Sequence, residues 1–299
     1  NFWVITWGYG AADPFKNGYN NVSGSNPWDQ VFLNETSFYT NYRFMDWART
    51  NNSNWDEWSD RTQKSASNQG TAAYEWMVDL CNRQNADMWV CIPHKVVDRN
   101  GVEKGTNNFI KKLAILVKTG VDKKNINLNG ISNLSSKSQQ DFINLGGVKT
   151  GDPLNSNLKV YIEYSNETRK YSYDQTSYCE TEGVALNLNS NQYHAAWMFH
   201  AYAAIRVFDE WEAVWGGNNN RVVKVDALQN QSGAFQTGLH LNVYRNSSLN
   251  PNGNYPDAFS SAPYIGNNVE GSAGNAIQQI EDDFFNNRLL RACWGIKYC

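Results

Sequence analysis

The chain has 299 residues, of which 41% are hydrophobic and 18% charged, so its length and composition allow it to bury a sizeable core. Its formal net charge is −3 and no Lys/Arg-rich block appears, which argues against a nucleic-acid partner and an anionic membrane surface. No apolar run approaches the ~18 residues of a membrane span. Aromatic residues make up 14% of the chain, and Asn occurs 41 times. A neutral surface rich in amides and rings suits sugars, which need stacking faces and amide hydrogen bonds.

Short apolar runs alternate with helical stretches along the chain, which is the pattern of a βαβ fold. Strands are predicted at 2–7, 42–46, 88–92, 158–164, 221–228 and 257–264. Helices are predicted near 72–83, 107–119, 192–215 and 273–291. The polar stretch 123–157 is predicted to be a long loop or insertion. No linker divides the chain, so residues 1–299 are predicted to form a single α/β domain with a parallel sheet.

Polar residues follow the predicted strands, at the edge where parallel α/β domains carry their sites. The fourth strand runs into Asn166-Glu167. Strand alternation places Glu163, Ser165 and Glu167 on one face, with the two carboxylates about 13 Å apart, too far to act across one bond. An amide beside a carboxylate suits a glycosidase, because the amide holds a sugar hydroxyl while the acid protonates the leaving oxygen. A solvated surface pair is an equal alternative for a single Asn-Glu step.

Five stretches carry a resemblance to a known superfamily. They are 26–28 (NPW), 42–47 (YRFMDW) with 50–51 (TN), 89–94 (WVCIPH), 160–167 (VYIEYSNE), and 256–259 (PDAF) with 262–264 (APY). In these motifs the chain resembles the clan-A glycoside hydrolases, the cellulase and β-mannanase superfamily, and is most similar to secreted bacterial cellulase-like proteins. The resemblance implies a (β/α)8 TIM-barrel-like fold, incomplete at its C-terminal end because only six strands are clear. It also implies retaining hydrolysis of a neutral β-linked polysaccharide.

The resemblance assigns roles to individual residues. Glu167 matches the general acid/base, and Asn166 matches the residue that holds the sugar 2-hydroxyl. Three more residues match positions that line the site: Arg43, His94 and Tyr264. Stacking platforms for sugar rings are expected from Trp7, Trp47 and Trp89, with core packing an equal alternative for Trp89.

Two departures from the superfamily put catalysis in doubt. Its nucleophile is a Glu that ends the seventh strand, whereas this chain ends in CWGIKYC, and Glu270 is the only nearby substitute. Retaining hydrolysis needs two carboxyls ~5–5.5 Å apart, so it requires Glu270 or sequence beyond Cys299. The Asn-Glu step continues with 168–170 (TRK), where relatives have Val-Trp-Asn. Cations beside Glu167 would lower the pKa of this acid and oppose its role as a general acid.

Cysteines and asparagines indicate the compartment. Cys293 with Cys299 is the easiest disulfide to close, Cys81 with Cys91 comes second, and buried reduced thiols in a cytosolic protein are the alternative. N-glycosylation triplets begin at Asn21, Asn34, Asn51, Asn133, Asn166, Asn230 and Asn246, against about five expected by chance. The N-terminus has no charged segment and no initiator Met, so we expect a mature or trimmed end. Together these features favour a secreted, extracellular glycoprotein.

The sequence is compatible with three functions. The first is a secreted glycoside hydrolase that acts on a neutral polysaccharide or oligosaccharide. The second is a pseudoenzyme, a glycosylated scaffold whose open sheet edges would pair between copies and form a filament, unless further chain or a short C-terminal strand covers them. The third is a carbohydrate-binding protein that kept the cleft and lost the chemistry. No metal or organic cofactor is implied, because the four His have no ligand spacing, and His200 is expected to be a core histidine.

Overall fold

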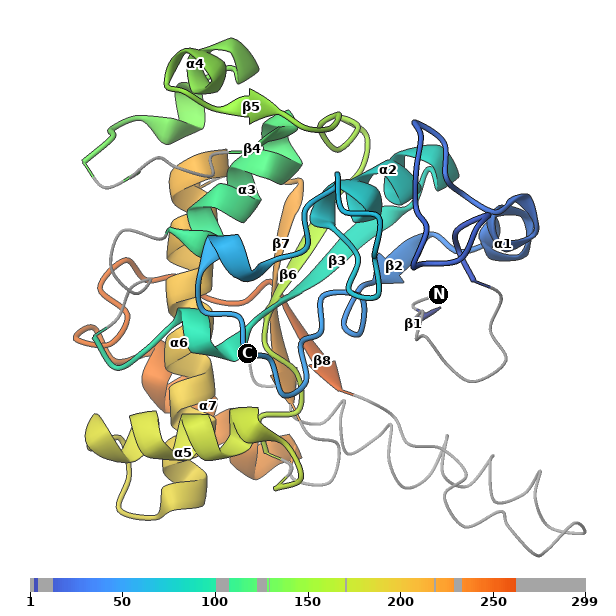
Figure 1. The fold of residues 1–299 in the computed structure, drawn as a ribbon. Helices are drawn as coiled ribbons and strands as arrows, with labels where there is room; N and C mark the ends of the chain where they lie inside the picture. Colours follow the sequence, from blue (N-terminus) through green and yellow to red (C-terminus); the bar gives the residue numbers. More distant parts are fainter. Residues whose placement is uncertain are drawn as a thin grey trace, which may run out of the picture.

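A six-stranded parallel sheet forms the centre of the molecule (Figure 1). The computed structural model describes residues 3–4, 13–100, 108–122, 128, 130–169, 171–217, 219–228 and 233–261. The strands lie in the order β1-β2-β3-β6-β7-β8, which is also their order along the chain. Their bounds are β1 Trp3–Val4, β2 Asn41–Arg43, β3 Asp87–Ile92, β6 Val160–Tyr164, β7 Val222–Leu228 and β8 Ala258–Ser261.

This strand order determines the shape of the sheet. A doubly wound sheet reverses its direction of growth, whereas here each new strand is added on the same side, parallel to the one before. The crossovers therefore place their helices on one face, and the twisted sheet curls around the other. The result is a mixed α/β fold with a curled parallel sheet, consistent with part of a barrel. It confirms the six predicted strands, and the described residues contain no closed eight-stranded barrel.

Helices cover the outer face of the sheet (Figure 1). The α-helices of the described residues are α1 Gln30–Thr36, α2 Tyr74–Gln84, α3 Phe109–Thr119, α4 Gln139–Asn144, α5 Asp174–Ala185, α6 Gln192–Trp215 and α7 Gly233–Tyr244. The short 3-10 helices are η1 Trp58–Asp60, η2 His94–Val96 and η3 Leu134–Ser136. Helices α2, α3 and α6 confirm three of the four predicted helices. The fourth, 273–291, lies outside the described residues.

Strand alternation separates two apolar clusters. On β3, Val90 and Ile92 point into the large core that the helices close. Trp89 and Cys91 point the other way and form a small cluster with Val225 of β7. Because side chains alternate along a strand, this second cluster marks the inner, concave face of the sheet. The polar residues of the candidate site share that face.

Helix α6 dominates the outer layer. It begins after Asn191, whose side chain accepts hydrogen bonds from the backbone N–H groups of Tyr193 and His194, which is an N-cap. Helix α5 packs closely on its first turns. A Cβ atom at Gly183 of α5 would lie 2.2 Å from the carbonyl oxygen of Ala195, so glycine permits this approach.

The prediction of a long loop over 123–157 is wrong in part. Strand β4 (Val121–Asp122) pairs antiparallel with β5 (Val148–Lys149), and η3 and α4 lie between them. A capping box between Ser138 and Asp141 starts α4. Such local polar hydrogen bonds leave no apolar periodicity in the sequence. The sequence pattern also does not indicate α1, α5 and α7.

The predicted Cys81–Cys91 disulfide is wrong, because both thiols are free and buried. Cys81 lies in the large core on α2, where its thiol donates to the backbone carbonyl of Asp87 (3.8 Å). Cys91 lies on the opposite face of β3, so the sheet separates the two sulfur atoms. Burial raises the pKa of both thiols well above the ordinary value. Cys179 is also free and buried, and the predicted Cys293–Cys299 pair lies outside the described residues.

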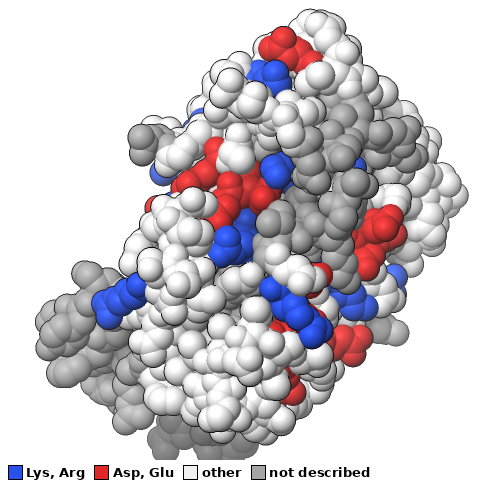
Figure 2. Space-filling view, turned by 90° about the vertical axis from the view of Figure 1, so that its left-hand side faces the viewer, with Lys and Arg blue, Asp and Glu red and all other residues white. Residues whose placement is uncertain are grey.

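The charged side chains on one face of the molecule are shown in Figure 2. Acidic and basic residues lie next to each other there, and most of that face is formed by uncharged residues. Within the part of the chain that the structure describes, no helix has the length and apolar character needed to cross a membrane.

Candidate functional site

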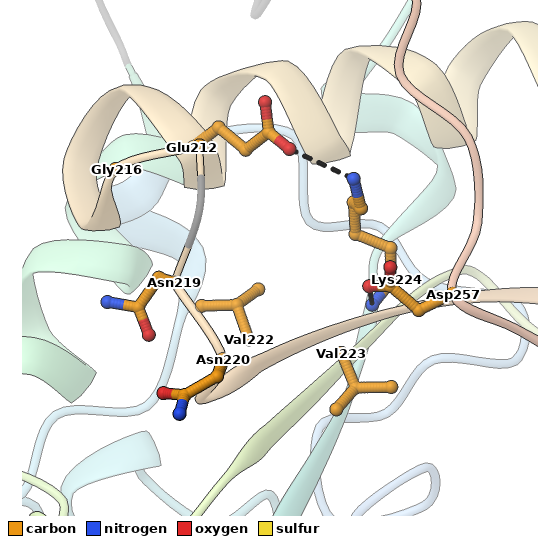
Figure 3. A pocket seen from close by; sticks show the side chains of 9 residues that line it. Glu212, Gly216, Asn219, Asn220, Val222, Val223, Lys224 and Asp257 are labelled. Carbon is orange, nitrogen blue, oxygen red and sulfur yellow. Dashed lines mark hydrogen bonds and ion pairs between the residues drawn. The ribbon is translucent and has the colours of Figure 1, made fainter.

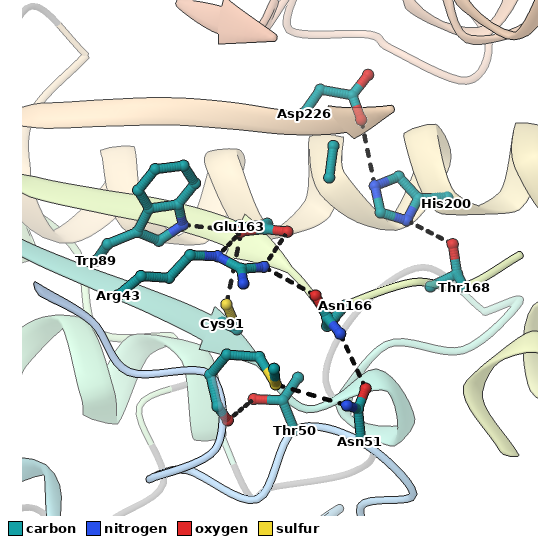
Figure 4. Close-up of polar contacts among 12 residues, drawn as sticks. Arg43, Thr50, Asn51, Trp89, Cys91, Glu163, Asn166, Thr168, His200 and Asp226 are labelled. Carbon is teal, nitrogen blue, oxygen red and sulfur yellow. Dashed lines mark hydrogen bonds and ion pairs between the residues drawn. The ribbon is translucent and has the colours of Figure 1, made fainter. Parts of the chain in front are cut away.

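An ion pair on the inner face joins β2 to β6 (Figure 4). Arg43, the last residue of β2, donates from Nε to Oε2 of Glu163 (3.0 Å) and from Nη2 to Oε1 (2.9 Å). Trp89 of the intervening strand β3 donates its indole N–H to Oε2 (2.8 Å). The Glu163 side chain is 1% exposed. Three N–H groups therefore bind the two oxygens of this buried carboxyl group.

Arg43 connects this pair to the turn after β6. Its Nη2 also donates to Oδ1 of Asn166 (2.9 Å), and Nδ2 of Asn166 donates to Oδ1 of Asn51 (3.0 Å). Gln175 of α5 donates to Oδ1 of Asn51 and to the backbone carbonyl of Asn166, both at 2.7 Å. These hydrogen bonds hold together the loop at Asn51, the turn after β6 and helix α5, at the carboxyl ends of the strands. An Asn side chain has two donor hydrogens and two acceptor lone pairs, so Asn166 keeps hydrogen-bonding capacity for a ligand.

The turn after β6 has an unusual backbone. Ser165 and Glu167 have φ angles of 56° and 41°, in the left-handed region, which costs about 1–3 kcal/mol each for such residues and is typical of functional sites. Strand alternation ends at Tyr164, so the prediction that Ser165 and Glu167 continue the face of Glu163 is wrong. Ser165 is fully buried and Glu167 is half-buried. Arg169 donates to the carbonyl oxygen of Ala227 on β7 (2.6 Å).

A second polar network leads from this turn to the helical side of the sheet (Figure 4). Oγ1 of Thr168 lies 2.9 Å from Nδ1 of His200 on α6, and Nε2 of His200 lies 3.2 Å from Oδ1 of Asp226 on β7. Oδ2 of Asp226 lies 2.7 Å from Nδ1 of His240 on α7. All four side chains are fully buried. Burial lowers the pKa of His200, and although burial opposes ionisation of Asp226, the two histidines hold its pKa well below the usual range.

Two other predicted site residues lie in the core. Trp47 is 1% exposed, and its ring packs against those of Trp28 (6.4 Å) and Phe44 (5.2 Å), so the prediction that it forms a stacking platform is wrong. His94 is fully buried and packs edge-on against Tyr178 (5.2 Å), so the prediction that it lines an open site is also wrong. The remaining predicted site residues lie outside the described residues: Trp7, Tyr264 and Glu270.

A pocket of about 350 Å³ lies at the opposite, amino edge of the sheet (Figure 3). The end of α6, the start of β7 and the residue before β8 form its walls. Glu212 and Lys224 make an ion pair across it (2.9 Å), and the backbone N–H of Lys224 donates to Asp257 (2.8 Å). The charges of this pocket are therefore largely compensated. Its position at the amino ends of the strands separates it from the Arg43–Asn166 network.

Sequence reasoning missed several members of the two networks. Asn51 entered only as part of a motif and a glycosylation triplet, and Gln175 belongs to a helix that the pattern does not indicate. Asp226 could have been identified from the sequence, because a carboxylate inside an apolar strand needs buried hydrogen-bond partners. Its partners are His200 of α6 and His240 of α7.

The site offers amides, a guanidinium group and one half-buried carboxylate, which suits a polar ligand without formal charge. Among the described residues, no group of three His, Cys, Asp or Glu side chains is placed to hold a metal ion. The chain matches no protein-family model, and no curated protein or solved structure matches it at a significant level.

Proposed function

We propose that the chain is a glycoside-hydrolase-like barrel protein that binds a neutral polysaccharide or oligosaccharide at the carboxyl ends of β2, β3 and β6. The observation that carries the proposal is the Arg43–Asn166–Asn51 network beside the left-handed turn at Glu167. It gathers several hydrogen-bonding groups and a carboxylate at the edge where parallel α/β folds carry their sites. Sugar hydroxyls both donate and accept hydrogen bonds, and amide side chains complement both.

Glu167 is the proposed general acid/base. In retaining hydrolysis it gives its proton to the glycosidic oxygen while a second carboxylate attacks the anomeric carbon, and it then takes a proton from the water that releases the sugar. Glu163 does not fit that second role, because it is buried and Arg43 binds both of its oxygens. Glu270 remains the proposed nucleophile.

Binding and hydrolysis of β-glucan and β-mannan oligosaccharides test this proposal. We expect Glu167→Gln to lower the hydrolysis rate at least ~100-fold because the proton donor is lost, with little change in Kd. Asn166→Ala should weaken binding about tenfold, since it removes hydrogen bonds to the sugar and to Arg43. Glu35→Gln, a substitution of an exposed acid on α1, is the matched control. Equal hydrolysis rates for Glu167→Gln and the wild type would refute the catalytic role.

The closed Arg43–Glu163 pair favours a second candidate, a carbohydrate-binding protein without turnover. Glu163, the carboxylate on the inner face of β6, is bound by Arg43 through both of its oxygens, so it is not available as the nucleophile of double displacement. This candidate predicts oligosaccharide binding by the wild type and by Glu167→Gln with equal Kd. Mass spectrometry after prolonged incubation would then find the oligosaccharide intact.

We further propose that the protein is secreted and carries N-linked glycans. Among the triplet asparagines that the structure describes, four are exposed: Asn21, Asn34, Asn133 and Asn246. A hydrophilic coat at these positions suits an extracellular protein. Self-assembly into a filament belongs to the non-catalytic alternative, and light scattering on natural material tests it.

A further inference from the structure

Five aromatic side chains form two groups of packed rings, which are together named the rim aromatic cluster: Tyr171, Tyr193, His194, Trp197 and Phe235. The ring centroids of Tyr171 and Tyr193 are 4.9 Å apart. The His194 ring lies 5.0 Å from Phe235 and 5.7 Å from Trp197, and Trp197 and Phe235 are 6.1 Å apart. The two groups are connected through the backbone of α6, at the consecutive residues Tyr193 and His194.

These rings are not part of the apolar core. Tyr171 is 52% exposed, Tyr193 45% and Phe235 56%, and none of the five residues belongs to either buried apolar cluster. Leaving large rings in water forgoes the stabilisation of burial, so a group of them indicates a binding surface. The edge-to-face packing of three of the ring pairs holds the rings in place before any ligand arrives.

The cluster borders the proposed carbohydrate site. Tyr171 follows β6, Tyr193 lies in the first turn of α6, and Phe235 lies in the first turn of α7, which follows β7. All three segments begin at the carboxyl edge of the sheet. Tyr171 is four residues from Glu167, so the chain limits the distance between their Cα atoms to about 14 Å.

The chemistry of the cluster favours a sugar chain over other ligands. Arg169, two residues before Tyr171, donates to the backbone carbonyl of Ala227. A nucleic-acid site would instead combine rings with basic side chains that face the ligand. The amides of Asn189 and Asn191 lie just before α6. Rings bind the apolar face of a sugar, and amides bind its hydroxyls.

We propose that the rim aromatic cluster is a second carbohydrate subsite, which binds the part of a neutral glycan chain that extends from the Glu167 site. The inference rests on the proposed carbohydrate-binding function and adds to it that long glycans are preferred over short ones. Each ring on which a sugar stacks adds affinity only when the glycan is long enough to reach it.

Calorimetric titration with a short and a long oligosaccharide of the same β-linked glycan tests the subsite. Tyr193→Ala and Phe235→Ala each remove an exposed ring, so the fold should be retained, which thermal melting checks. We expect each variant to bind the long oligosaccharide about tenfold more weakly and the short one with unchanged Kd. The matched control is Phe38→Ala, which removes a ring that is 67% exposed and lies before β2, at the opposite edge of the sheet.

The outcomes separate this inference from the proposed function. If both variants bind the long oligosaccharide like the wild type, the subsite is refuted and the proposed function stands. If the wild type binds neither oligosaccharide, the proposed function fails and the subsite with it. If the variants keep full affinity but change the mass measured by light scattering, the cluster is a contact between copies of the chain, and the subsite is likewise refuted.

Discussion

Arg43 and Glu163 form a largely buried ion pair, and each charge compensates the loss of water around the other. If Arg43 is replaced by Met, the donors that remain to the buried Glu163 carboxylate among the described residues are the Trp89 N–H and the Cys91 thiol. We expect Arg43→Met to lower the free energy of unfolding by about 3–5 kcal/mol, because an uncompensated charge remains in the interior. Urea denaturation of both proteins at neutral pH measures this loss.

A surface ion pair provides the control for that experiment. Arg83 pairs with Asp79 on α2, where the two side chains are 36% and 25% exposed. Arg83→Met should cost no more than about 1 kcal/mol, because water screens the pair. The double variant Arg43→Met/Glu163→Leu should recover most of the lost stability. Equal losses from Arg43→Met and Arg83→Met would show that the inner-face pair is not effectively buried.

Residue type and position in a strand predict some of these residues but not others. The end of the fourth predicted strand identified Asn166, and the resemblance identified Arg43. The structure brings these two residues into hydrogen-bond contact. Aromatic residues resist such prediction, because a Trp in the core and a Trp on the surface have the same local sequence signal. Trp47 is in the core, whereas Trp197 is in the rim aromatic cluster. Tertiary packing decides between the two, because Trp47 packs against the buried rings of Trp28 and Phe44, whereas Trp197 packs against the exposed ring of Phe235.

At the scale of secondary-structure elements, the His200–Asp226–His240 network joins α6, β7 and α7. The pKa of His200 lies below its ordinary value of 6.5 because of burial, so the unfolded chain binds the proton more readily. Stability is therefore complete above about pH 6.5 and falls as the pH drops below it, by up to about 1.4 kcal/mol per pH unit. The lowered pKa of Asp226 stabilises the fold above its ordinary value of 3.8, and this contribution is lost only at more acidic pH.

The substitution His200→Gln tests this pH dependence. Between about pH 7 and about pH 5, the unfolding free energy of the wild type should fall more steeply than that of His200→Gln, as measured by urea denaturation at several pH values. The charged and titratable groups around His200 include Arg169, Asp226 and His240, and all stay in place in this variant. His194→Gln, at the start of the same helix, is the control for the loss of one histidine. If the unfolding free energies of the wild type and His200→Gln fall in parallel with decreasing pH, the pH dependence does not come from His200.

The elements with strong apolar periodicity were the ones that the sequence predicted. Helix α6 and the six strands of the parallel sheet follow directly from their patterns. Helix α5 depends on its contact with α6 at Gly183, and α4 depends on a capping box. Tertiary and polar contacts of this kind are not encoded as periodicity, so these elements were missed.

At the scale of the whole molecule, the faces of the sheet decide the state of the cysteines. Cys81 and Cys179 lie in the large core and Cys91 lies on the inner face, and all three are free and buried. We therefore expect that peptide mapping of the unreduced protein, alkylated after unfolding, finds all three as free thiols. In the folded protein they should resist alkylation, because they are buried and their pKa values are raised. A Cys81–Cys91 peptide in this map would contradict the placement of the two residues on opposite faces of β3.

The fold also divides the glycosylation triplets into accessible and enclosed asparagines. Asn166 is 8% exposed, and its Nδ2, the atom that would carry the glycan, donates a hydrogen bond to Oδ1 of Asn51. The side chain of Asn51 is half-buried, and its Nδ2 faces the sulfur of Met45 (3.6 Å). We therefore expect glycopeptide mapping of natural material to find Asn51 and Asn166 unmodified, and to find glycans at the exposed Asn21, Asn34, Asn133 and Asn246. A glycan on Asn166 would break its bond to Asn51 and fill the carboxyl edge of the sheet, so its detection would exclude the proposed carbohydrate site.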